Sequence, residues 1–101
     1  MRDRAVTEDL GQALVSLLAS SIADFIDRPS ADAEAIRTND DDCGALAACI
    51  ADPAQREYVS AHLTLALRQL VDAIRENDPQ ALEQAQWWAR EQLETMKAQA
   101  R

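Results

Sequence analysis

Apolar residues recur at intervals of three and four along most of the chain, the spacing that places them on one face of an α-helix. Thr7 is a good N-cap for the first such segment, and Pro29 disfavours helix at Arg28, so we expect this helix to end near Asp27. Its single broad apolar stripe consists of Leu10, Leu14, Leu17, Leu18, Ile22, Phe25 and Ile26.

Two short helices are expected next. Ser30 can cap a short helix that carries Ala33 and Ile36, and the polar run Thr38–Asp42 then forms a connection. The last aspartates of this run can cap a second short helix, whose apolar positions are Leu46, Cys49 and Ile50.

An Asp-Pro pair precedes each of the two remaining helical segments. Asp52 and Asp78 are placed as N-caps, with the following proline at the first helical position, where its missing N–H costs nothing. Gln55 can complete a capping box with Asp52. The first of these helices is expected over residues 53–77, and its inward positions are Val59, Leu63, Leu67, Leu70, Val71 and Ile74.

The second Asp-Pro helix is expected to run from Pro79 almost to the last residue. No segment alternates apolar and polar residues with β-branched content, so no sheet is expected. The pattern therefore predicts an all-α fold, a compact bundle of about five helices, three long and two short, in a single domain over residues 1–101.

Charge divides the chain unevenly. The net charge is −8, and residues up to Asp52 hold 11 acidic and 4 basic side chains, against 7 acidic and 6 basic from Pro53 onward. Direct nucleic-acid binding is disfavoured, because phosphate contacts need a cationic surface. An acidic half suits a basic protein partner, or it serves solubility alone.

Membrane and export signals are weak in this sequence. No run of 18 or more apolar residues is present, so no membrane span is expected. The segment Ala13–Ala23 resembles the apolar core of a signal peptide, but Asp3, Glu8 and Asp9 cancel the positive charge that such a leader carries before its core. A cytoplasmic location is favoured.

The last helix contains both tryptophans, which are adjacent and must point in different directions. On a helical wheel with Leu82 at zero, Trp87 falls at about 140° and Trp88 at about −120°. Trp88 can fold over the edge of the core beside Ala81 and Ala85. Trp87 shares a polar face with Glu83, Arg90, Glu91 and Glu94. Either packing buries both rings, or Trp87 is exposed and anchors a partner.

A narrow apolar seam lies on the other side of this helix. Its members fall within about 60° of one another and can support close approach of a second helix, in the same chain or across a dimer axis. The seam consists of Leu82, Ala85, Ala89, Leu93 and Met96.

Catalytic and metal-binding motifs are not apparent. Cys43 and Cys49 are six residues apart, which matches no zinc or redox spacing. We expect Cys49 in the core and Cys43 at a helix N-terminus, where three neighbouring aspartates oppose formation of a thiolate. His62 is expected to border the core, with Tyr58 four residues before it on the same face.

The acidic run Asp40–Asp42 fails as a calcium loop, because alignment on Gly44 places Ile50 where the glutamate ligand belongs. No phosphate-binding loop, paired zinc-binding histidines or serine elbow occurs in the sequence. We therefore expect no enzymatic activity, no cofactor and no metal.

Three functional hypotheses remain. The first is a small acidic inhibitor or adaptor that docks on a basic surface of a partner protein, for example a phage or mobile-element antagonist of the anti-CRISPR or DNA-mimic kind. Its contact residues would be Trp87, Trp88, Arg90, Glu91, Glu94, Asp40, Asp41 and Asp42. The second is a structural or chaperone-like homodimer joined along the seam. The third is an enzyme that uses His62 with carboxylates.

Overall fold

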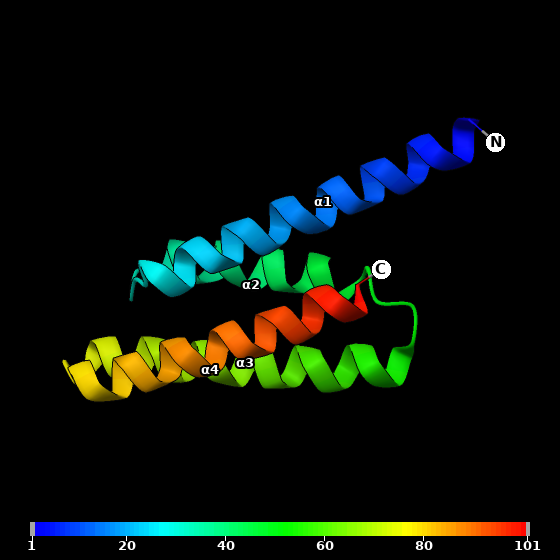
Figure 1. Ribbon diagram of the computed structural model, residues 1–101. Helices are drawn as coiled ribbons and strands as arrows, with labels where there is room; N and C mark the ends of the chain where they lie inside the picture. The colour runs from blue at the N-terminus through cyan, green and yellow to red at the C-terminus, as the bar shows by residue number, and fades with distance from the viewer. Residues whose placement is uncertain (1, 101) are drawn as a thin grey trace.

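The computed structural model describes the backbone of residues 2–100 and the side chains of residues 10–100. This part of the chain contains four helices and no strand. The helices run alternately up and down, which makes an antiparallel bundle (Figure 1). They are α1 (Arg2–Asp27), α2 (Ala33–Ala47), α3 (Pro53–Arg75) and α4 (Pro79–Gln99). The all-α prediction is confirmed, and the expected count of five helices is too high by one.

The difference in count comes from α2, which replaces the two short helices expected before Asp52. The polar run Thr38–Asp42, expected as a connection, is helical. One face of α2 is buried at three- and four-residue spacing by Asn39, Cys43, Leu46 and Ala47. Tertiary burial of this face outweighs the poor helix propensity of asparagine and aspartate.

Three helices begin with an aspartate N-cap. Asp52 accepts from the N–H of Ala54 and Asp78 from that of Ala81, as the Asp-Pro pairs predict. Asp32, rather than Ser30, caps α2, and Ser30 Oγ accepts from the N–H of Asp32. The prediction that Ser30 is the cap is therefore wrong.

Two other expected starting signals also differ. α1 already begins at Arg2, so Thr7 lies within the helical backbone rather than at its start, and its side chain lies outside the described ones. The capping box expected between Gln55 and Asp52 is not among the described hydrogen bonds at the start of α3. The side-chain contact observed there is made by Arg56, whose guanidinium donates twice to the carbonyl of Ile50 at 3.0 and 2.8 Å. This contact ties the α2–α3 loop to α3.

A tight turn joins α3 to α4. Asn77 has a left-handed backbone with φ of 52°, which asparagine tolerates better than most residues. The N–H of Asp78 donates to the carbonyl of Ala73, and that of Asn77 to Ile74, so the last carbonyls of α3 are satisfied in a Schellman motif. Asp78 then caps α4, so one short turn ends one helix and starts the next.

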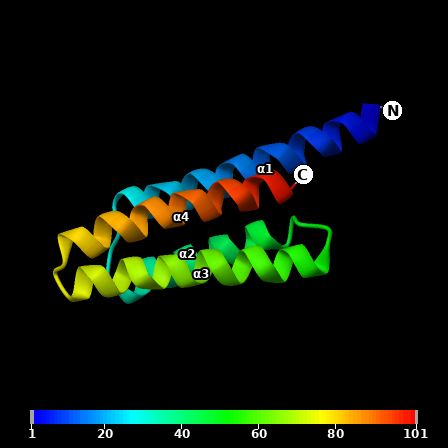
Figure 2. The same ribbon diagram turned by 60° about the horizontal axis from the view of Figure 1, so that its bottom comes forward.

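The core lies between all four helices, and α3 and α4 form the most extensive pair (Figure 2). α1 packs on α2 and α4, and α3 packs on the same two helices from the other side. The largest completely buried side chains are Ile22, Ile26, Leu46, Ile50, Val59, Leu63, Leu70 and Met96.

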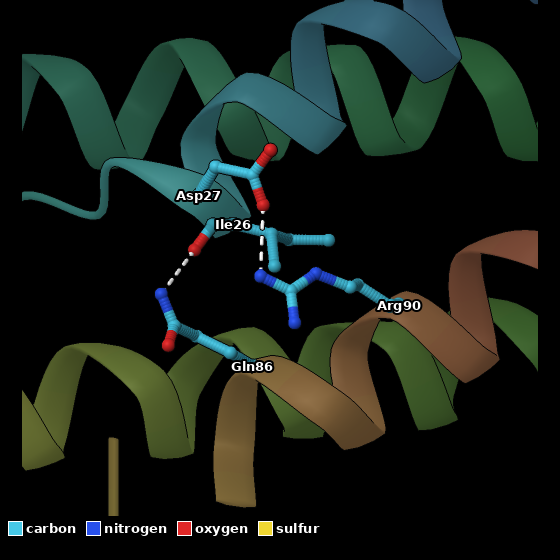
Figure 3. A network of polar contacts seen from close by, with 4 residues as sticks. All are labelled: Ile26, Asp27, Gln86 and Arg90. Carbon is cyan, nitrogen blue, oxygen red and sulfur yellow. Dashed lines mark hydrogen bonds and ion pairs between the residues drawn. The ribbon is translucent and has the colours of Figure 1, made fainter. Parts of the chain in front are cut away.

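The C-terminal end of α1 is fastened to α4 by two polar contacts (Figure 3). Gln86 Nε2 donates to the carbonyl of Ile26 at 2.9 Å, and Arg90 pairs with Asp27 at 2.9 Å. Ile26 lies in the last turn of α1, where the carbonyls have no donor within the helix, and Gln86 supplies a donor to one of them.

The other end of α1 extends past the rest of the bundle (Figures 1 and 2). The Cα radius of gyration is 14.4 Å and the principal extents are 53 × 24 × 19 Å. A compact domain of this length has a radius of gyration of about 13 Å. The molecule is therefore elongated along α1.

Candidate protein-binding surface

The two tryptophans have different surroundings. Trp87 is 64% exposed, and Trp88 is half-buried and packs against the core. The prediction that Trp87 is exposed to solvent and that Trp88 lies at the edge of the core is therefore confirmed. The alternative in which both rings are buried is wrong. A fully solvated indole exposes a large apolar area, which is typical of a binding surface.

The charged residues that share this part of α4 are largely engaged with their own chain. Arg90 pairs with Asp27 of α1, and Glu94 accepts from Lys97 at 3.2 Å. Glu91 is exposed. Both ion pairs are well solvated, so each contributes at most about 1 kcal/mol and can open when a partner binds.

The aspartates of the acidic run lie on a different element. Asp40 and Asp41 are exposed on α2, and Asp42 is half-buried and accepts from Ser21 Oγ of α1 at 2.6 Å. None of the three lines the groove next to Trp87 described below. The structure therefore does not gather the sequence-predicted contact residues into one site.

A groove of about 890 Å³ lies between α3 and α4 on the side where Trp87 and Trp88 project. Ala73 and Ala85, buried at 3% and 4% exposure, are among the residues that line it. The other lining residues are Gln69, Asp72, Glu76, Gln80, Ala81, Glu83, Gln84, Trp87 and Trp88.

The charge of this groove is entirely negative among its lining residues. Asp72, Glu76 and Glu83 are exposed there, and no lysine or arginine of the described side chains lines it. Sequence reasoning grouped Glu83 with Trp87 but missed Asp72 and Glu76 of α3. Their four-residue spacing indicates that Asp72 and Glu76 share one face of α3. The sequence does not show that this face lies next to Trp87 of α4.

The seam of α4 is occupied within the chain. Four of its residues, Ala85, Ala89, Leu93 and Met96, are buried in the common core, and Leu82 is half-buried against it. Of the two arrangements that the sequence allows for this seam, packing within the chain is the one observed, and a dimer axis along it would require the bundle to open. The close helix approach that the alanines allow is made with α3.

His62 has a local role. It is half-buried, its Nδ1 lies 2.8 Å from the carbonyl of Tyr58, and the two rings stack with centroids 4.2 Å apart. Among the residues described, no group of three or more His, Cys, Asp and Glu side chains is placed to hold a metal ion. The described contacts of His62 include no carboxylate of the kind that the enzyme hypothesis requires.

The expected position of Cys43 at a helix N-terminus is wrong, and the expected core position of Cys49 is met only in part, since Cys49 packs at the edge of the core. Cys43 lies in the middle of α2 with 5% exposure, and Cys49 is only half-buried, its Sγ 3.5 Å from the carbonyl of Ala45. Burial raises the pKa of the Cys43 thiol from 9.0 to about 12, and the carboxylates of Asp40 and Asp42 add to the rise. Cys43 is therefore protonated at neutral pH and is a poor nucleophile.

A second cavity, of about 450 Å³, separates α2 from α3. Asn39 lines it with 4% exposure, and its Oδ1 has no hydrogen-bond partner among the described residues. Arg68 and Asp72 lie on the opposite wall, on α3.

α1 presents the largest exposed aliphatic side chains. Leu10, Leu14 and Leu17 are 66%, 49% and 69% exposed. The window Leu10–Asp27 also has the length and mean hydropathy, 1.3, of a helix that could cross a membrane. Signal sequences and mostly buried core helices share these properties, and here only 17% of the window is buried, at Ala19, Ile22 and Ile26.

Comparisons with known proteins found no matching family model, no matching curated protein and no matching solved structure.

Proposed function

We propose that this chain is a non-catalytic protein-binding module that docks on a basic surface of another protein. The exposed indole of Trp87, next to a groove lined by acidic but no basic side chains, supports this best. Solvated tryptophan is common among the residues that dominate binding energy, and a net charge of −8 favours fast encounter with a cationic partner. Inhibition or scaffolding of a nucleic-acid-handling protein is one form that this activity can take.

The proposal is tested by affinity capture from the native host, followed by reconstitution with the purified captured protein. We expect the affinity to fall as salt is raised, because charge attraction is screened. Trp87→Ala should abolish capture. Tyr58→Ala is the matched control, since Tyr58 is 61% exposed but lies outside the groove. An affinity that is unchanged between low and high salt would contradict docking on a basic surface.

A structural homodimer is the second candidate, and the exposed leucines of α1 favour it. The contact surface would be the face formed by Leu10, Leu14 and Leu17, not the α4 seam. Light scattering at micromolar concentration distinguishes the two candidates. A dimer that dissociates on Leu14→Glu would support this second candidate, and a strict monomer over that concentration range would eliminate it.

A further inference from the structure

The groove between α3 and α4 combines a small-residue base with an aromatic side. Ala73 and Ala85 are buried where the helices approach, and their short side chains leave room that longer ones would fill. Trp88 is fixed against the core, whereas Trp87 remains largely solvated. The groove therefore offers an indole surface without any rearrangement of the bundle.

Carboxylates surround this aromatic surface. Glu83 lies one helical turn before Trp87 on α4, and Asp72 and Glu76 lie one turn apart on α3. Gln69, Gln80 and Gln84 add amide donors and acceptors, and none of the lining residues that the structure describes is cationic. An anionic occupant would be repelled, and a purely apolar one would leave the carboxylates facing it without partners.

A guanidinium group fits both properties of the groove. It stacks on an indole face through cation–π attraction, and its planar N–H donors match the two oxygens of a carboxylate. An ammonium group is attracted to the same charges but is more strongly hydrated and does not stack.

Resting on the function proposed above, we infer that this groove receives an arginine-bearing segment of the partner protein. The guanidinium lies on the Trp87 indole and donates to the carboxylates of Glu76 and Glu83. Asp72 contributes charge at the α3 side of the groove.

The inference is tested on the isolated ¹⁵N-labelled chain with a blocked tetra-arginine peptide. We expect the peptide to shift the indole N–H signals of both tryptophans and the backbone signals of the groove residues on α3 and α4. A blocked tetra-lysine peptide should bind more weakly, by about threefold, because an ammonium group is more strongly hydrated and lacks the planar stacking of a guanidinium group. Equal affinities for the two peptides would contradict recognition of a guanidinium group.

Paired variants separate the groove from the overall negative charge. Glu76→Gln with Glu83→Gln removes two groove charges, and Asp24→Asn with Glu57→Gln removes two exposed charges outside it. The first pair should raise the Kd by about threefold or more, and the second should leave it nearly unchanged at moderate salt. Circular dichroism melting confirms that each variant is folded.

The outcomes distinguish failure of this inference from failure of the proposed function. Shifts centred on Asp40–Asp42, or equal weakening by both pairs, would overturn the groove as the arginine site and still leave an acidic binding surface. No shift anywhere in the chain would contradict binding of basic segments as well.

Discussion

Leucine has opposite surroundings in two regions of this molecule. In the α3–α4 hairpin, Leu63 and Leu70 are completely buried, whereas Leu10 and Leu17 of α1 are about two-thirds exposed. Both sets follow helical spacing, so both are faces of amphipathic segments. The spacing of apolar residues in the sequence therefore predicts that a helix has an apolar face. Whether that face is buried depends on the length and position of the neighbouring helices.

The largest contrast is expected from leucine truncation in the two regions. Leu70→Ala should lower the free energy of unfolding by about 2–5 kcal/mol, because it removes buried contacts and leaves a cavity. Leu17→Ala should change it by less than about 0.5 kcal/mol. Urea denaturation measures both. A large loss for Leu17→Ala would break the comparison, since it would mean that a second copy covers α1.

Replacement of alanine by leucine tests the same difference between the buried hairpin and the exposed part of α1, by adding side-chain volume instead of removing it. Ala89→Leu should destabilise the protein by about 1–3 kcal/mol, because Ala89 is completely buried in the α4 seam. Ala13→Leu on the exposed surface of α1 should be nearly neutral. Thermal melting followed by circular dichroism gives both values. A neutral Ala89→Leu would show that the hairpin is more loosely packed than the structure has it.

A third prediction concerns the buried face of α2, where Cys43 should make the stability of the protein fall at alkaline pH. The folded thiol of Cys43 has a pKa of about 12, against 9.0 for an unperturbed cysteine, so the unfolded state loses its proton first. The stabilisation by the protonated thiol is complete below pH 9 and is lost as pH rises toward 12. At pH 10 the loss should be about 1 kcal/mol.

Comparison with Cys43→Ala isolates this contribution from the other groups that titrate at high pH. Urea denaturation between pH 8 and about 10.5 should show a steeper fall for the parent chain than for the variant. Parallel curves would contradict the burial of this thiol.

The smallest effect is expected at the junction between the two regions. Gln86→Ala removes the donor to the Ile26 carbonyl and should cost about 1 kcal/mol. Amide hydrogen exchange should become faster in the last turns of α1 and remain unchanged in α3. Gln80→Ala, an exposed position in α4, is the control. Equal protection in the parent chain and Gln86→Ala would mean that packing and the Arg90–Asp27 pair hold this end of α1 without Gln86.

Much of the fold could be predicted from local signals. The Asp-Pro pairs located the starts of α3 and α4, and Pro29 located the end of α1, because capping and proline geometry act within a few residues. The Thr38–Asp42 run was misjudged, because its helix is stabilised by burial of Asn39 and Cys43 against other elements. That burial depends on tertiary contacts.

The candidate surface was only partly predictable for the same reason. The wheel of α4 separated Trp87 from Trp88 correctly, since both lie on one helix. Asp72 and Glu76 come from α3, and their position beside Trp87 depends on how the two helices are rotated against each other. The wrong prediction for Cys43 has this origin too, because α2 continues through the polar run and places Cys43 on its buried face.

The fastening of α1 at Gln86 and Arg90 has a mechanical consequence. Leu10 lies 16 residues from Ile26, or about 24 Å along the axis. A rotation of about 5° at the fastened end displaces Leu10 by about 2 Å. The buried residues Ile22 and Ile26 and the contacts of Gln86 and Arg90 hold this end of α1, so a change in its angle to α4 displaces the opposite end of the helix most.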